Sequence, residues 1–210
     1  VNTLITHIQA YLYQKKEWSP YQEGAFAPAL CNRIDRNTGG IVIAAKTAEG
    51  LRVMNQKIRD RELKKYYLCI VHGTLPRPAG RLEGYILKDE AKKQVTVSSR
   101  PRPGAKTAVT LYETLAVRNG LSLVRCQLIT GRTHQIRAQF AAAGHPLLGD
   151  GKYGSERQNK RYGRSYQALY SYRLEFCFTT DAGALAPLDG QQFQVEQVDF
   201  VTEYFPGFSL

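Results

Sequence analysis

The sequence predicts an α+β fold, with a mixed, mainly antiparallel sheet and a few flanking helices. Three observations lead to this class. Strand-like runs outnumber helical ones, most of them are joined as hairpins, and the Asn119-Gly120 dipeptide suits a tight hairpin turn. The chain has 210 residues, so one domain with a sizeable core is expected over residues 1–210.

In the first part of the chain we expect two helices and two strands. Four apolar residues recur at helical spacing within residues 1–14 and predict a short amphipathic helix. After the Gly39-Gly40 turn, the apolar run Ile41–Ala45 predicts a strand. A helix is expected over roughly Ala48–Glu62 and a strand over Tyr66–Val71.

The rest of the chain contains most of the expected strands. They are placed at Gln94–Ser98, Val109–Leu115, Leu121–Ile129, Tyr172–Phe178 and Phe193–Val198. A helix is expected to begin near Thr133 as its N-cap and to end at Gly144, because Pro146 prevents its continuation. The polar, basic segment 155–165 is expected to be a mobile loop.

Positive charge is concentrated in some segments and missing from others. The net charge is +11, yet residues 174–210 hold six acids and no lysine or arginine. Residues 85–110, in contrast, carry six lysines and arginines against two acids. A cationic face for a polyanion is the simplest explanation, and nucleic acid is favoured over membrane because no basic amphipathic helix is visible.

The cysteines and the apolar runs limit the kinds of site and the cellular locations to be expected. The four cysteines lie far apart, without the spacing of a zinc site or a secreted disulfide framework, so we expect reduced cysteines. No run approaches the roughly 20 apolar residues of a membrane span, and nothing resembles a signal peptide. A cytoplasmic location is therefore expected. The chain begins with valine, which suggests that an upstream part is missing.

One candidate site surrounds Asp35. This carboxylate stands between Arg33 and Arg36, just before a Gly-Gly turn. Neighbouring arginines stabilise the charged form of a carboxylate, so an ionised Asp35 would be available as a nucleophile or base. A turn aspartate with two surface arginines is the alternative that the residues leave open.

A second candidate site lies where a glycine turn enters the helix after Thr130. Free N–H groups at a helix N-terminus favour an anion, and Arg132 flanks that position. His134 and Arg137 are three residues apart and share a helical face. A phosphate, or an aspartate from elsewhere in the chain, would fit there. The alternative is an ordinary capped helix with solvated cations.

A third candidate is the run Lys64-Lys65-Tyr66-Tyr67. Adjacent strand residues point to opposite faces, so one tyrosine is expected in the core and the other outside. A tyrosine can stack on an unstacked base, although core packing is the more common role. The histidines show no metal-ligand spacing, and no nucleotide-binding or hydrolase motif is visible.

Five blocks in the sequence, taken in order, resemble those of the RluA-type pseudouridine synthases. The blocks are NRIDRNTGGIVIAAKT, KYYLCIVHG, KTAVTLYETL, TGRTHQIRAQFAAAGHPLLGDGKYG and ALYSYRLEF. They cover roughly residues 30–205, and one such block alone would be a weak signal. The resemblance implies the pseudouridine synthase fold, with a central cleft in the mixed sheet and flanking helices.

The resemblance also implies roles for individual residues. Asp35 matches the aspartate that the family requires for isomerisation, Tyr67 the active-site tyrosine, and Arg137 the arginine that pairs with the aspartate. Ile136 would line the uracil pocket. The residues expected to contact RNA are Arg33, Arg36, Lys65, Arg132 and His134.

The implied reaction breaks the C1′–N1 bond of a uridine in RNA, rotates the uracil and rejoins it through C5. An isomerisation of this kind requires no cofactor and no metal, and the target base must leave the stack. The favoured substrate is large-subunit ribosomal RNA, and we expect a monomer without an obligate protein partner. The alternatives are a transfer-RNA pseudouridine synthase and a non-catalytic, basic RNA-binding or ribosome-assembly module.

The sequence departs from the family pattern at several positions. Asn32 and Gln139 replace two usual histidines, Gly39 replaces a serine, and Tyr170 stands where a later block has histidine. None of these removes the aspartate, tyrosine or arginine, but they leave the target uridine open. An upstream strand with a Lys-Pro-x-Gly loop, and the small S4-type domain of many relatives, are expected to be missing.

Overall fold

The computed structural model describes residues 2–210 and divides them into two compact units. The first unit contains the chain up to Ile34, together with Val42–Leu63 and Glu175–Gln192. The second contains Asp35–Ile41, Lys64–Leu174 and Phe193–Leu210. No helix in the described part of the chain is long and apolar enough to cross a membrane.

The first unit is built around two capped helices. Helix α1 (Leu4–Gln14) begins after Thr3, whose side chain accepts the N–H of Thr6. Helix α2 (Ala48–Arg59) begins after Thr47 in the same way, since a side-chain oxygen satisfies an N–H that the helix leaves unpaired. Both helices confirm the sequence prediction. The unit also contains the 3-10 helix η1 (Gly183–Leu188).

A buried ion pair ties α2 to the following chain. The Lys57 ammonium lies 2.6 Å from the Glu62 carboxylate and also donates to Thr180, while Glu62 accepts from Thr179. Both charged side chains are almost fully buried. These bonds hold the pKa of Glu62 at about 2, below its ordinary 4.5, although burial opposes the shift.

The expected strand over Ile41–Ala45 is wrong. Within this run only Ala44–Ala45 forms a strand, β3, which pairs with β1 (Ala29–Leu30) in the first unit. Just before the run, β2 (Gly39–Gly40) pairs with β9 in the second unit. The N–H of Ile43 is taken by the Asn32 side chain at 2.7 Å. Side-chain bonding of this kind competes with a strand ladder, and hydropathy does not reveal it.

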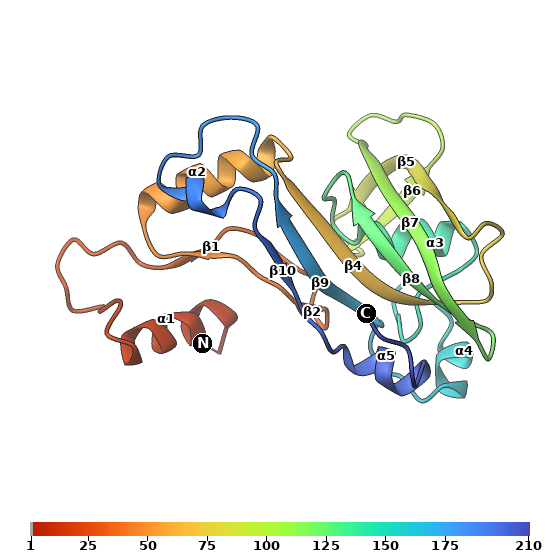
Figure 1. Ribbon diagram of the computed structural model, residues 1–210. Coiled ribbons are helices and arrows are strands. Elements are labelled where there is room, and N and C mark those ends of the chain that lie inside the picture. Colours follow the sequence, from red (N-terminus) through yellow and green to blue (C-terminus); the bar gives the residue numbers. More distant parts are fainter. Residues whose placement is uncertain (1) are drawn as a thin grey trace. The chain divides into compact units, whose positions relative to one another are not determined.

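The sheet has eight strands, and all but β2 follow the order β10-β9-β4-β8-β7-β5-β6 (Figure 1). Their bounds are β4 Leu63–His72, β5 Ala79–Asp89, β6 Gln94–Ser98, β7 Lys106–Arg118, β8 Leu121–Leu128, β9 Leu169–Phe176 and β10 Gln192–Gln194. Strands β4 to β8 pair antiparallel where adjacent, whereas β2 pairs parallel with β9. The mixed, mainly antiparallel sheet confirms the predicted fold class.

Strand β4 contributes to a core on each face of the sheet. Tyr67 and Cys69 pack in one apolar cluster with Phe140 of α3 (Gln135–Ala142). Leu68 and the strand residues two positions from it pack on the opposite side of the sheet. Their cluster includes Phe200 of α5 (Asp199–Tyr204). Because strand side chains alternate, Tyr67 is placed on the α3 side of the sheet.

The start of α3 differs from the prediction. Thr133 is not the N-cap; that position is His134, in the left-handed conformation at φ 51° and without a side-chain cap. Instead, Gln135 holds the turn, since its Oε1 accepts from the Arg132 N–H and the Thr130 hydroxyl. The helix therefore begins one residue later than Thr133 suggested.

Two short helices replace expected loop and strand. Helix α4 (Glu156–Arg161) forms within the expected loop 155–165, because Ser155 caps it and the buried Asn159 accepts the Gly149 N–H. The expected strand Phe193–Val198 is confined to β10, and α5 follows it. The expected strand Tyr172–Phe178 is shifted, since β9 begins at Leu169.

Candidate active site

The loop that carries Asp35 is held by hydrogen bonds to the backbone. The Thr38 N–H donates to the Asp35 carbonyl at 3.0 Å and closes a turn. The buried Gln167 amide donates to the Arg36 carbonyl at 2.6 Å and to the Thr38 hydroxyl. These bonds fix the backbone on the C-terminal side of the carboxylate.

Glycine is required where this loop meets the sheet. Gly40 has φ 113°, a conformation that side chains rarely allow. A Cβ atom there would lie 2.1 Å from the Ser171 carbonyl oxygen. The close approach lets β2 pair with β9, and this pairing anchors the Asp35 loop on the sheet.

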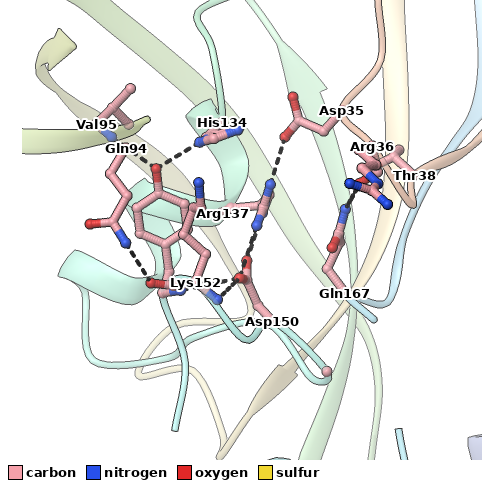
Figure 2. A network of polar contacts seen from close by, with 12 residues as sticks. Asp35, Arg36, Thr38, Gln94, Val95, His134, Arg137, Asp150, Lys152 and Gln167 are labelled. Carbon is pink, nitrogen blue, oxygen red and sulfur yellow. Dashed lines mark hydrogen bonds and ion pairs between the residues drawn. The ribbon is translucent and has the colours of Figure 1, made fainter. Parts of the chain in front are cut away.

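Arg137 projects from the first turn of α3 and contacts two carboxylates (Figure 2). Its Nη1 donates to Oδ2 of Asp35 at 3.2 Å. Its Nε and Nη2 donate to Oδ2 and Oδ1 of Asp150, at 2.7 and 3.0 Å. Burial alone would lower the pKa of Arg137, but Asp150 and then Asp35 outweigh it and raise that pKa.

Asp150 is completely buried. Besides Arg137, its Oδ1 accepts the backbone N–H groups of Lys152 and Tyr153, at 2.9 and 3.1 Å. Burial would raise the pKa of Asp150, but the guanidinium and these N–H donors lower it. Asp150 is therefore held in its charged form.

Tyr67 reaches the same site from β4. Only 7% of it is exposed, and burial raises the pKa of its hydroxyl. A hydrogen bond with Ser171 opposes that rise, whereas the charge of Asp35 adds to it. Ile136 packs in the same apolar cluster as Tyr67. The tyrosine therefore stays protonated at neutral pH, with its ring beside an apolar neighbour.

His134, the N-cap residue of α3, is held by Tyr153. Its Nδ1 lies 2.8 Å from the Tyr153 hydroxyl, which also accepts the Val95 N–H at 2.9 Å. Burial lowers the pKa of His134, and the charges of Asp35 and Arg137 act on it in opposite directions. Figure 2 shows these contacts, which join His134 to Val95 of β6 through the Tyr153 hydroxyl.

The residues expected to contact RNA occupy different surroundings. Lys65 is half-buried on β4, on the Tyr67 side, and burial lowers its pKa. Arg132 donates to the Thr107 carbonyl at 3.0 Å. Arg36 is exposed beside the Asp35 loop, and Arg33 is exposed within the first unit.

The structure thus brings together most of the residues singled out from the sequence. Asp35, Tyr67 and Arg137 meet in the second unit. At the helix start, for which a phosphate or an aspartate was expected, Arg137 bonds Asp35. Asp150 and Tyr153 were missed as site residues. The only available signal was their place in the Gly-Asp-x-x-Tyr-Gly stretch at 149–154, to which no role was assigned.

Three departures from the family pattern have structural roles in this chain. Gln139 is buried and bonds the Thr110 hydroxyl, besides donating to two strand carbonyls. A Cβ at position 39 would lie 2.5 Å from the Tyr170 ring, so glycine at 39 accommodates the tyrosine. These side chains support the framework and do not bond Asp35 or Arg137.

A family profile described as RNA pseudouridylate synthase matches residues 4–142. The chain belongs to this family. An uncharacterized RNA pseudouridine synthase of Mycoplasma pneumoniae is 33% identical over 99% of this chain and 61% of its own length. Proteins named ribosomal large subunit pseudouridine synthase D are 31% identical in Borreliella burgdorferi, over 83% of this chain and 51% of theirs, and in Zymomonas mobilis, over 86% and 54%.

The chain spans about half the length of the curated relatives that it matches. Two solved human structures share its fold. RNA pseudouridylate synthase domain containing 4 has a TM-score of 0.70 at 22% identity, covering 94% of this chain and 80% of that one. Domain containing 1 has a TM-score of 0.64 at 19% identity, covering 84% and 79%. The family predicted from the five blocks is confirmed.

Proposed function

We propose that this protein isomerises uridine to pseudouridine in RNA, with Asp35 as the catalytic carboxylate. The observation that carries the proposal is the state of this carboxylate. Oδ2 is bonded to Arg137, and within residues 2–210 Oδ1 has no hydrogen-bond partner. With 23% of its side chain exposed, Asp35 presents a positioned oxygen to solvent.

This arrangement fits the chemistry of the isomerisation. The C1′–N1 bond breaks, a C1′–C5 bond forms, the proton at C5 leaves, and N1 takes up a proton. Asp35 would either attack C1′ or remove a proton from C2′ to give a glycal. Arg137 would hold the carboxylate in position, because its guanidinium is planar and always protonated.

Tyr67 and Ile136 would receive the base. The target uridine has to leave the stack, at a cost of a few kcal/mol, and an aromatic face can replace part of the lost stacking. Tyr67 offers that face beside Asp35, and Ile136 packs in the same cluster. No redox step occurs, so the proposal requires no cofactor.

Phosphate contacts would position the RNA strand without reading its sequence. We assign them to the exposed or half-buried cations Arg33, Arg36, Lys65 and Arg132, together with His134. A module that only binds RNA needs no carboxylate facing the polyanion. The Asp35–Arg137–Asp150 cluster, with two carboxylates and one guanidinium, therefore favours catalysis over binding alone.

Large-subunit ribosomal RNA is the proposed substrate, and its support is the name of two of the relatives. Transfer RNA is the alternative, because target choice depends on contacts outside the reacting centre. We further propose that residues 1–210 belong to one catalytic domain, which the family match across residues 4–142 supports. A cytoplasmic monomer remains a prediction.

Tritium release from RNA labelled at C5 of uridine tests the proposal. Ribosomal and transfer RNA are incubated separately with the wild type and with Asp35→Asn. Release from ribosomal RNA by the wild type alone supports both the activity and the substrate class. Release from transfer RNA alone would show that transfer RNA, and not ribosomal RNA, is the substrate. RNA binding with no release from either RNA would contradict the activity and favour the binding module.

A further inference from the structure

Arg137 is shared unequally between its two carboxylates. Asp150 takes the Nε and Nη2 edge in a bidentate pair, at 2.7 and 3.0 Å. Asp35 receives one longer bond from Nη1, at 3.2 Å. Bidentate pairing is the geometry that guanidinium and carboxylate groups prefer. The buried aspartate therefore holds the arginine more firmly than the proposed catalytic one.

Asp150 is itself a rigid support. It is completely buried, and the N–H groups of Lys152 and Tyr153 fix its Oδ1. The Tyr153 ring lies 5.3 Å from the centre of the guanidinium. Because the guanidinium is planar, fixing Nε and Nη2 also fixes the direction of Nη1. The contacts with Asp150 therefore determine the position of Nη1, the arginine nitrogen that bonds Asp35.

The unequal sharing has a consequence for Asp35. An arginine with no other carboxylate would pair with Asp35 through two nitrogens and occupy both of its oxygens. Since Asp150 already occupies one edge of the guanidinium, only Oδ2 of Asp35 is bonded, and Oδ1 is available to the ribose.

We propose that Asp150 is a positioning residue that holds Arg137 in single-bonded contact with Asp35 and so leaves one oxygen of Asp35 free for the substrate. This inference rests on the proposed catalytic role of Asp35. Asp150 does not touch the reacting atoms; it acts through the arginine.

The first test replaces Asp150 by Asn, which keeps the shape of the side chain but presents an N–H to Nε of Arg137. We expect kcat for tritium release to fall by about 10²-fold, the size typical of small misplacements in an active site, with little change in RNA affinity. Asp199→Asn is the matched control, because Asp199 pairs with Arg164 on the surface at 3.2 Å. We expect wild-type kcat for that variant.

A second test separates positioning from simple support of the fold. In an Arg137→Lys background the single ammonium cannot divide its edges between two carboxylates, so adding Asp150→Asn should lower kcat by less than about 3-fold more. Multiplication of the two separate losses would show that Asp150 acts independently of Arg137 and would overturn the inference.

Nitrogen NMR of Arg137 gives a readout that does not depend on activity. The Nε–H signal should be protected from solvent exchange in the wild type and exposed in Asp150→Asn, with unchanged protection in Asp199→Asn. If Asp150→Asn does not fold, Asp150→Glu is the second variant. It keeps the buried charge but displaces the Arg137 guanidinium, and it should show the same loss of kcat.

Different results would contradict the proposed function and the positioning role of Asp150. A wild type that binds RNA and forms no pseudouridine contradicts the proposed function. An active wild type with an equally active, folded Asp150→Asn leaves the proposed function intact and overturns the positioning role.

Discussion

Replacing Gly39 by Ala tests how the Asp35 loop is seated on the sheet. Gly39 is outside the left-handed region, so its backbone conformation tolerates a side chain. The added Cβ, however, would lie 2.5 Å from Cε2 and 2.8 Å from Cδ2 of Tyr170. Carbon atoms in contact prefer about 3.5–4.0 Å, so one of the two groups has to move. Gly39 and Tyr170 face each other in the β2–β9 pair, which restricts that movement.

The expected cost follows from this overlap. Inserting a methyl group into a packed site typically costs about 1–3 kcal/mol. We therefore expect Gly39→Ala to lower the free energy of unfolding by about 2 kcal/mol. In a Tyr170→Ala background the ring is gone, and the same substitution should cost less than about 0.5 kcal/mol. The resulting coupling of more than about 1 kcal/mol lies within the range for residues in contact.

Urea unfolding of the four proteins in this cycle measures the coupling. Gly40→Ala is the control, since its Cβ would meet the backbone oxygen of Ser171 at 2.1 Å, and Tyr170→Ala cannot relieve that contact. Additive costs for Gly39→Ala and Tyr170→Ala would refute the reasoning. Rescue of Gly40→Ala by Tyr170→Ala would also refute it, because the effect would then not be local to the ring.

Three further predictions concern the core and the titrating groups. Phe140 is fully buried in the Tyr67 cluster, so Phe140→Ala should cost about 3–5 kcal/mol in urea unfolding; a cost below 1 kcal/mol would contradict this packing. Glu62 has a pKa of about 2 against an ordinary 4.5, so its stabilisation is complete above pH 4.5 and is lost as the pH falls towards 2. Glu62→Gln should flatten the fall of the urea midpoint between these pH values, and an unchanged slope would argue against the Lys57 pair. Burial lowers the pKa of His134 below 6.5, so its contribution is present above pH 6.5 and declines on acidification; His134→Gln should weaken that decline in thermal melts.

Most of the fold could be predicted because its signals are local. The Asn119-Gly120 turn between β7 and β8, and the threonine caps of α1 and α2, each depend on residues close in sequence. The run at 41–45 failed because its partners lie elsewhere: the Ile41 N–H bonds the Ser171 carbonyl, and the Ile43 N–H bonds a side chain. Hydropathy alone carries no information about such partners.

The part of the site that could be predicted is the part that the family motifs name. Arg137 and Asp35 are 102 positions apart, and only the family resemblance connected them before the structure placed them 3.2 Å apart. Asp150 was missed because a buried aspartate is indistinguishable from a surface one in a single sequence. Its role depends on four N–H donors that converge only in the folded chain.

The most direct test of the account is turnover by Asp35→Asn under single-turnover conditions, with RNA binding measured on the same preparation. We expect tritium release from C5-labelled RNA to fall below detection. The Kd for RNA should stay within a few-fold of the wild type, because the proposed phosphate contacts involve other residues. Release at a rate near that of the wild type would contradict the assignment of Asp35 as the catalytic carboxylate.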